Sequence, residues 1–412
     1  MTIAIDDVRR LLEAGDLPGA VRSLRPRAEA LSLPELAAAT KALADAAGFE
    51  DLAAAADAAG SRPDDPQVLY DLGYGCVERG IAFLAVGPLR EALRLLPESR
   101  PLLAELVSAL EDEHRHAEAA ALLAARGERL AAWPETYLLV HHTLLAGDLP
   151  GARTVAARLP DPQDDTWRGA HARQRRMLAR AELAATAGPL DRADLRGWQF
   201  ALTGTLLGTL SPYGFGAGMT GRYGFLGDTH AQCRRGLARL ALALEATGRR
   251  RATTTVSLLP GRSDRILGLA AAAVLGLPAV PYAPTRTDTA VIAYDLGDCD
   301  PQLAQSLRTR AEGQVLHEHA TRWTSPPPVS PDSSALLAQY VQSPWREDDR
   351  PEEEIARDVA RADAAPDPGD GEGPPDPDDA FRAYAAAVAP GWLTGTRDHL
   401  GSPGPVPSSR FA

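Results

Sequence analysis

Residues that suit anion binding gather in the segment Pro260–Arg265, which reads PGRSDR. It ends a strand-like run at 253–261 and precedes a helix predicted to begin at Ser263. A helix amino terminus presents free backbone N–H groups, and arginine adds charge-assisted hydrogen bonds. We therefore expect this turn to hold a phosphate-like group. The candidate anion-binding residues are Gly261, Arg262, Ser263, Arg265 and, from a glycine-rich loop at 211–228, Arg222.

Two acidic residues, Asp295 and Asp298, follow the apolar run TAVIAY at 289–294. Ligands of open α/β sheets bind at the carboxyl ends of strands, so these carboxylates are candidates for binding a cation or ribose hydroxyls. The pair His317 and His319 lies in a predicted helix, where residues two apart point to different sides. We expect no metal site there, and the pattern identifies neither a catalytic residue nor a cofactor.

The elements that must position these residues alternate between strand and helix after Gly188. Such alternation predicts βαβ units, a parallel sheet and an α/β domain at 189–325. The predicted strands lie within 195–212, at 253–261, at 279–284 and at 289–298. The predicted helices lie at 229–248, 263–278 and 300–323.

Residues 250–325 resemble a type I phosphoribosyltransferase in their order of strand, small phosphate loop, buried helix and apolar strand ending in Asp295. Tyr294 stands where that family has a second acid, and the segment GDCDPQ replaces its Thr/Gly-rich loop. The resemblance implies an enzyme that acts on a phosphorylated or nucleotide-like small molecule.

The first half of the chain repeats a helical pattern, and the heptapeptide AGDLPGA occurs at 14–20 and again at 146–152. Turn positions recur at Gly15, Gly48, Gly80, His114 and Gly147. Five places after each turn stands a small residue, at Ala20, Ala53, Ala85, Ala119 and Ala152. Residues 64–99 read as two amphipathic helices joined by a tight turn.

This unit resembles the tetratricopeptide repeat, a helix-turn-helix of 34 residues. The resemblance rests on Leu69, Leu72, Gly73, Cys76, Gly80, Ala85, Leu89, Ala92 and Pro97. It implies an α-solenoid over residues 1–188, in which the long helix after Trp167 caps the array.

In this family the first helix of each unit lines a concave groove, and the resemblance assigns six groove positions here. They are Tyr70, Tyr74, Ser108, Glu111, Tyr137 and His141. Aromatic and hydrogen-bonding side chains suit an extended peptide or another protein. Two alternatives are open: the tyrosines pack against neighbouring helices, or the groove binds the second domain of the same chain.

Residues 326–412 form a Pro/Asp-rich tail. We predict a short helix at 333–342, a helix in the middle of the acidic stretch 346–379, a flexible Pro/Gly/Asp run after it, and a docking helix within 379–395. The last residues, GSPGPVPSSRFA, read as disordered.

The formal net charge of −12 disfavours nucleic-acid binding, which needs a basic footprint. Three cysteines without CxxC spacing indicate reduced thiols, and no apolar run is long enough to span a membrane. The early acidic residues argue against a signal peptide, so we expect a cytoplasmic protein, and its Arg, Ala and Pro usage is typical of bacteria. We expect a scaffold or adaptor with an α/β domain as second binding module, and as the alternative the enzyme named above.

Overall fold

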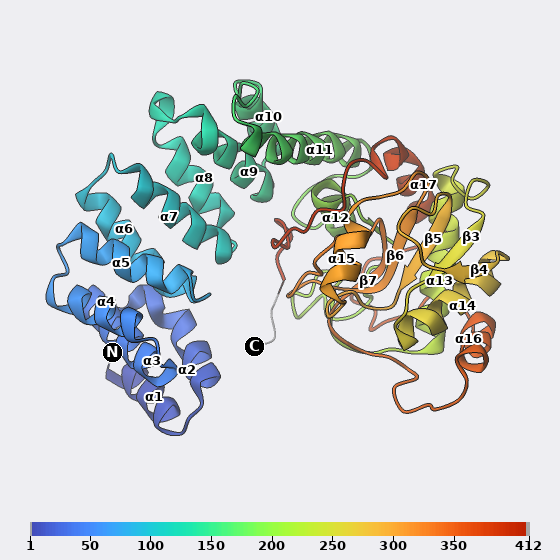
Figure 1. Ribbon diagram of the computed structural model, residues 1–412, viewed down its shortest axis with the longest axis horizontal. Helices are drawn as coiled ribbons and strands as arrows, with labels where there is room; N and C mark the ends of the chain where they lie inside the picture. Colours follow the sequence, from blue (N-terminus) through green and yellow to red (C-terminus); the bar gives the residue numbers. More distant parts are fainter. Residues whose placement is uncertain (1, 409–412) are drawn as a thin grey trace. The chain divides into compact units, whose positions relative to one another are not determined.

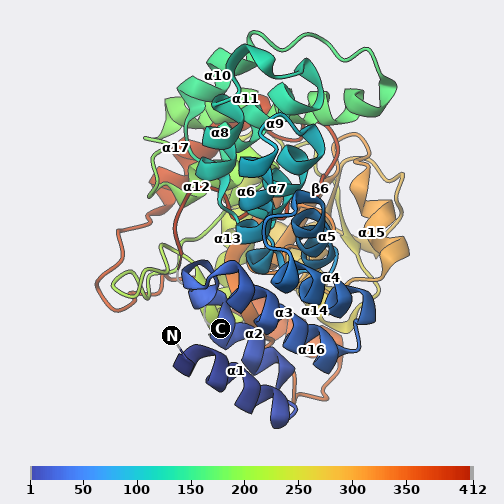
Figure 2. The same cartoon turned by 90° about the vertical axis from the view of Figure 1, so that its left-hand side faces the viewer.

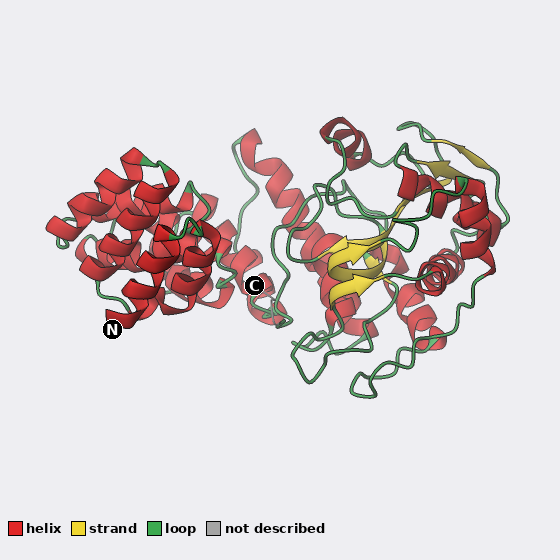
Figure 3. Ribbon diagram, turned by 90° about the horizontal axis from the view of Figure 1, so that it is seen from below, coloured by secondary structure: helices red, strands yellow, loops and turns green. Residues whose placement is uncertain are grey.

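The chain divides at Pro160 into two compact units, and the computed structural model describes its residues 2–408. The described part of the first unit is helical, and the second surrounds a parallel sheet with helices (Figure 3). The predicted class, α plus α/β, is confirmed. The border precedes the helix α11 (Asp165–Ala187), whereas we predicted it after residue 188. The helix α11 packs on α12 and α17 and so lies within the second unit.

Successive helices of the first unit pack on their neighbours in chain order (Figures 1 and 2). They are α1 (Thr2–Glu13), α2 (Leu17–Leu24), α3 (Leu33–Ala47), α4 (Glu50–Ser61), α5 (Pro66–Val77), α6 (Val86–Leu95), α7 (Arg100–Asp112), α8 (His116–Ala124), α9 (Tyr137–Leu145) and α10 (Leu149–Ala156). All five predicted turn residues have φ between 55° and 91°, in the left-handed region. The five alanines that follow them are at most 6% exposed.

The repeated heptapeptide begins a helix in both places. Asp16 accepts a hydrogen bond from the Gly19 amide at 2.8 Å, and Asp148 accepts one from the Gly151 amide at 2.9 Å. Each aspartate therefore caps the helix that follows, α2 or α10, as its position after the turn glycine predicts.

Seven parallel strands form the sheet of the second unit, in the order β1-β7-β6-β5-β3-β4, with β2 also paired to β7. The strands are β1 (Leu206–Leu207), β2 (Tyr223–Gly227), β3 (Thr255–Leu258), β4 (Ala279–Pro281), β5 (Thr289–Ala293), β6 (Val315–Arg322) and β7 (Ser333–Gln342). Besides α11, the helices are α12 (Leu195–Thr203), α13 (His230–Ala246), α14 (Arg262–Leu275), α15 (Pro301–Arg308), α16 (Glu352–Arg361) and α17 (Asp378–Val388).

Helices cover both faces of the sheet. α13 packs on β6 and β7, α14 packs on β3 and β5, and the two helices contact each other, so they share one face. Leu303 and Leu307 of α15 pack with Val291 and Leu316, which point to the opposite face. The core therefore lies on both sides of the strands, as a parallel sheet requires.

Three predicted elements are wrong. Residues 195–203 form the helix α12, where we predicted strand. The predicted helix at 300–323 ends early at Arg308, and its second half is the strand β6. The predicted short helix at 333–342 is the strand β7, which lies inside the sheet. Because β7 is part of the sheet, residues after 325 complete the α/β fold rather than form a separate tail.

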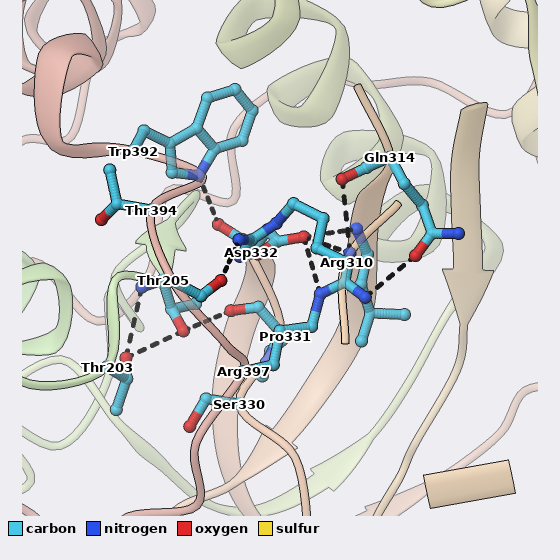
Figure 4. Close-up of polar contacts among 12 residues, drawn as sticks. Thr203, Thr205, Arg310, Gln314, Ser330, Pro331, Asp332, Trp392, Thr394 and Arg397 are labelled. Carbon is cyan, nitrogen blue, oxygen red and sulfur yellow. Dashed lines mark hydrogen bonds and ion pairs between the residues drawn. The ribbon is translucent and has the colours of Figure 1, made fainter. Parts of the chain in front are cut away.

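The chain after α17 is held by a buried ion pair (Figure 4). The Arg397 guanidinium donates to Asp332 Oδ2 from Nε at 2.9 Å and from Nη2 at 2.7 Å, and both side chains are at most 3% exposed. Trp392 Nε1 donates to the Asp332 carbonyl at 2.8 Å. These contacts lie before the predicted disordered end at 401–412, of which residues 409–412 lie outside the described chain.

Candidate ligand-binding site

A cavity of about 1060 Å³ lies where β1 and β2 pair with the same edge of β7. β1 pairs with the start of β7 and β2 with its second half, so the connection 208–222 leaves the sheet between them. This connection and β2 form one wall of the cavity. The first turns of α13 form a second wall, and the segment 365–377 forms a third.

Three arginines and two aspartates meet beside this cavity. Arg196 binds both Asp376 carboxylate oxygens, at 2.9 and 3.0 Å, and Arg235 Nη2 donates to Asp378 at 2.6 Å. Arg239 lies 3.5 Å from Asp376 and 3.3 Å from Asp378 as an ion pair. Three guanidinium groups thus share two carboxylates, which leaves a surplus positive charge at the wall.

Several buried donors of this wall have no hydrogen-bond partner within residues 2–408. They are Arg239 Nη1, Arg235 Nε and Thr209 Oγ1. Arg239 is only 1% exposed, and its burial, together with the charges of Arg235 and Arg196, lowers its pKa to about 10. A buried donor without an acceptor costs about 1–3 kcal/mol, so this wall favours an acceptor group in the cavity.

Acidic residues of the segment 365–377 bind the glycine-rich connection. Tyr213 donates its hydroxyl to Asp367 at 2.7 Å, the Gly214 amide donates to Asp370 at 3.0 Å, and the Gly216 amide donates to Glu372 at 2.9 Å. These contacts give a defined position to the Pro/Gly/Asp run, which the composition predicts to be flexible.

A buried polar network lies on the sheet side of α13. Asp228 Oδ2 accepts from the Tyr294 hydroxyl at 2.9 Å and the Cys233 thiol at 3.2 Å, and it lies 2.9 Å from His319 Nε2. One ligand atom each of Asp228, Cys233 and His319 lies within 4.8 Å of the others, so the set could hold a metal ion. Burial opposes charge on Asp228, yet the contact with His319 and its hydrogen bond bring the net pKa of this carboxyl below its ordinary value.

Cys233 does not suit nucleophilic chemistry in this network. Burial, followed by the charge of Asp228, raises the pKa of the thiol well above its ordinary value, so it stays protonated at neutral pH. Cys233 and His319 are also fully buried. The Cys233 thiol contacts Asp228 and His319 in the structure.

The histidines of the HEH segment lie on a strand, not on the predicted helix. Residues two apart in a strand share a face, so His317 and His319 point to the same side of β6. They bind different partners, since His317 Nδ1 lies 3.1 Å from Ser333 Oγ while His319 contacts Asp228. Sequence reasoning missed His319 because it assigned the helical period to this segment.

Glu318 points away from these histidines and is fully buried. Its carboxylate accepts from the Leu296 amide at 2.6 Å and from the Thr321 hydroxyl. Burial is the main cause that raises the pKa of Glu318 to about 8, so this side chain is neutral at pH 7. Burial likewise raises the pKa of Asp264 to about 6.

The predicted anion turn lies at the carboxyl end of β3, as expected, but the chain itself binds its side chains. Arg262 donates to the Trp345 carbonyl at 3.2 Å and to the Asp348 carbonyl, and Arg265 binds Glu352 at 2.8 Å. Ser263 Oγ accepts from the Trp345 indole at 2.9 Å. Gly261 caps α14 with an extended backbone. The segment 345–352 thus takes the place expected for an anion.

Arg222, Asp295 and Asp298 also have partners within the chain. Arg222 is 1% exposed and donates to carbonyl groups of residues 403–407. The two aspartates share Arg322, which lies 2.9 Å from Asp295 and 2.5 Å from Asp298. In this structure both carboxylates therefore hold a guanidinium, and their binding of a cation or ribose hydroxyls stays a prediction.

The six predicted groove residues of the first unit separate into three pairs. Tyr70 and Tyr74 stack with ring centroids 6.0 Å apart on α5, and Tyr74 is 45% exposed. Tyr137 and His141 are each 5% exposed and stack on each other at 6.2 Å. The remaining two, Ser108 and Glu111, are partly exposed on α7.

Carboxylates lie near this tyrosine pair, of which Tyr74 is exposed and Tyr70 is half-buried. Burial raises the pKa of Glu105 on α7, and the charges of Glu78 and Asp112 raise it further. The pKa of Tyr70 rises through burial, then through the charge of Glu105 and Tyr74. These effects show that Glu105 lies near Tyr70 and that Glu78 and Asp112 lie near Glu105.

Glu111 differs from these carboxylates, because it contacts a histidine cluster. It lies 3.5 Å from His141 Nε2 and 3.6 Å from His142 Nε2. Although burial opposes charge on Glu111, the histidines lower its pKa to about 2. His142 Nδ1 in turn lies 3.2 Å from His116 Nδ1.

We found no match to this chain among protein-family models, curated proteins or solved structures. No helix within residues 2–408 combines the length and apolar character that crossing a bilayer demands.

Proposed function

We propose that the protein is an adaptor whose first unit, a tetratricopeptide-type solenoid, binds a protein or peptide, with the α/β unit as a second binding module. The solenoid proposal is supported by the left-handed turns that recur every 32 to 34 residues and by the buried alanine after each turn. Close approach of paired helices supports it too. A Cβ on Gly73 of α5 would lie 2.4 Å from Leu89 of α6.

The observation that carries the binding proposal is the stacked pair of half-buried Tyr70 and exposed Tyr74, with Glu105 near Tyr70 and with Glu78 and Asp112 near Glu105. A tyrosine face attracts cations, and the carboxylates add charge of the complementary sign. The partner that this surface suits is therefore a basic, extended segment, with Arg or Lys side chains placed over the rings.

Selection from a random peptide library on the full-length protein tests this proposal, followed by anisotropy measurements on the selected peptides. We expect Arg/Lys-rich peptides, and about fivefold weaker binding for Tyr74→Ala or Glu105→Gln, which corresponds to about 1 kcal/mol. Tyr340→Ala, at a tyrosine 52% exposed in the other unit, is the matched control. Selected peptides without basic residues, or binding that ignores Tyr74→Ala, would contradict the proposal.

The second candidate is the enzyme acting on a phosphorylated or nucleotide-like molecule. It is favoured by one observation: the turn Pro260–Arg265 and Asp295 follow β3 and β5, adjacent strands at which the strand order reverses. Ligands of doubly wound folds bind at such a point. Thermal shifts with nucleotides and sugar phosphates, repeated on Arg262→Ala, test it, and a shift that Arg262→Ala abolishes would support it. The phosphoribosyltransferase resemblance and a cytoplasmic location stay predictions.

A further inference from the structure

We propose that the cavity between α13, the connection 208–222 and the segment 365–377 binds an amphipathic organic anion, a carboxylate or phosphate on an apolar body. This inference rests on the proposed role of the α/β unit as a second binding module and gives the chemical class of its ligand. None of the sequence-predicted anion residues except Arg222 lines the cavity.

The anion end is defined by Arg235 and Arg239, which lie four residues apart on one face of α13 and both line the cavity. Asp376 and Asp378 neutralise only part of the charge of the three arginines at this wall. The Arg239 guanidinium is 1% exposed and its Nη1 has no acceptor within residues 2–408. An anionic oxygen would satisfy this donor and balance the remaining charge.

Thr209 supports the same position, because its buried hydroxyl also lacks a partner in the described chain. It lines the cavity two residues after β1. Arg235, Arg239 and Thr209 thus each offer a donor without a partner in the described chain. A carboxylate or a phosphate has several acceptor oxygens and could bind these donors together.

The remaining walls are largely apolar, which suits a hydrocarbon or aromatic body rather than a free inorganic ion. Among the lining residues are Leu210, Met219, Tyr223, Leu226 and Leu336. The volume, about 1060 Å³, matches that of sites for small organic molecules.

The segment 365–377 forms the wall through which a ligand can enter. Its polar contacts with the connection, between Tyr213 and Asp367, Gly214 and Asp370, and Gly216 and Glu372, lie at the exposed surface. Exposed polar contacts of this kind contribute little stability, so the part of the segment at 367–372 can open at small cost, while Asp376 stays bound to Arg196.

The test is calorimetric titration of the full-length protein with decanoate, decyl phosphate, decanol, decylamine and inorganic phosphate, below their critical micelle concentrations. We expect binding of decanoate or decyl phosphate, and at least tenfold weaker binding of the alcohol, the amine and inorganic phosphate. Which of the two decyl anions binds more tightly identifies the head group.

Arg235→Gln should weaken binding of the decyl anion at least tenfold, while Arg234→Gln, the matched change one residue earlier and outside the cavity lining, should not. Thr209→Val is a second variant that removes a donor with little change of volume, and circular dichroism verifies that each variant folds. Equal binding of decanol and decanoate, or Arg235→Gln without effect, would overturn the proposal. Basic-peptide binding by the first unit is measured on the same variants, so failure of the adaptor proposal is recognised separately.

Discussion

Arg397 and Asp332 lie 65 residues apart in the chain and form a doubly hydrogen-bonded, buried ion pair (Figure 4). Asp332 stands directly before β7, and Arg397 stands near the end of the described chain. Arg397 also donates to the Leu307 carbonyl at 2.7 Å and to Gln314 Oε1 at 3.0 Å. The pair thus connects the final segment to the central sheet and to the end of α15.

Removing Arg397 should strongly destabilise the α/β unit. Arg397→Met leaves the Asp332 carboxylate buried with one partner fewer, and breaking a buried pair in this way costs about 3–5 kcal/mol. Urea unfolding measures the loss. Arg308→Gln, at an arginine whose side chain is 59% exposed, should change stability by less than about 0.5 kcal/mol. A loss for Arg397→Met no larger than that of this control would contradict the role assigned to the pair.

Two Gly→Ala changes in helices should have opposite signs. On α11, Gly169 has no atom within 4 Å of a built Cβ, so Gly169→Ala should stabilise by about 0.5–1 kcal/mol. On α13, a Cβ at Gly236 would lie 2.6 Å from Ala335 Cβ and 2.9 Å from His319 Nδ1. Gly236→Ala should therefore destabilise by about 1–3 kcal/mol. Thermal unfolding of both variants checks the prediction, which fails if both move in the same direction.

The helical half could be predicted because its signals are local. A left-handed turn favours glycine, a helix start favours aspartate, and a close contact between helices favours alanine. Gly15, Asp16 and Ala20 therefore indicate the turn, the helix start and the helix contact within six residues. The same three signals return at Gly147, Asp148 and Ala152. Each of these signals can be read from neighbouring residues, without knowing which distant parts of the chain they contact.

The strands β6 and β7 could not be predicted in this way. A strand buried on both faces loses the alternation that identifies strands, and HEH and LLAQ read as helical. The buried polar groups of β6 are tolerated only through distant partners. His319 contacts the Asp228 carboxylate, and Glu318 accepts a hydrogen bond from the Leu296 amide. The pattern of neighbouring residues does not show which distant residues form these hydrogen bonds.

The cavity was missed for a related reason. Its walls come from residues near Thr209, from α13, from β7 and from 365–377, which are more than 150 residues apart in the chain at their extremes. Arg235 and Arg239 read as the solvated face of an amphipathic helix. Only the fold shows that they are buried against a cavity.

Glu318 should make the protein less stable as pH rises. Its folded-state pKa, about 8, exceeds the ordinary value of 4.5, so the folded state keeps a proton that the unfolded state releases. Stability from this group is present below pH 4.5 and falls by about 1.4 kcal/mol per pH unit up to about pH 8. Glu318→Gln removes this dependence. In urea unfolding, we expect the stability of Glu318→Gln relative to wild type to increase between pH 5 and 8. The control Glu353→Gln, on the exposed side of α16, should show the same pH dependence as wild type.

The buried histidines of the first unit should have the opposite effect, a loss of stability in acid. Burial is the main cause that lowers the pKa of His116 to about 3 and that of His142 to about 4, from 6.5. Below pH 6.5 these histidines are therefore protonated in the unfolded state but stay neutral in the folded state. Each histidine costs about 1.4 kcal/mol per pH unit down to its folded pKa. Glu111, with its pKa lowered to about 2, offsets none of this, since its own contribution changes only below pH 4.5.

Hydrogen exchange of peptides from α8 and α9, corrected for intrinsic rates, measures this loss between pH 7 and 5. We expect protection in both helices to fall in wild type and to fall less in His142→Gln, whose amide carries no titratable proton. His399→Gln, at an exposed histidine of the other unit, should behave as wild type. Protection that is independent of pH in wild type, or an equal fall in His142→Gln, would show that protonation of this cluster does not control the helices.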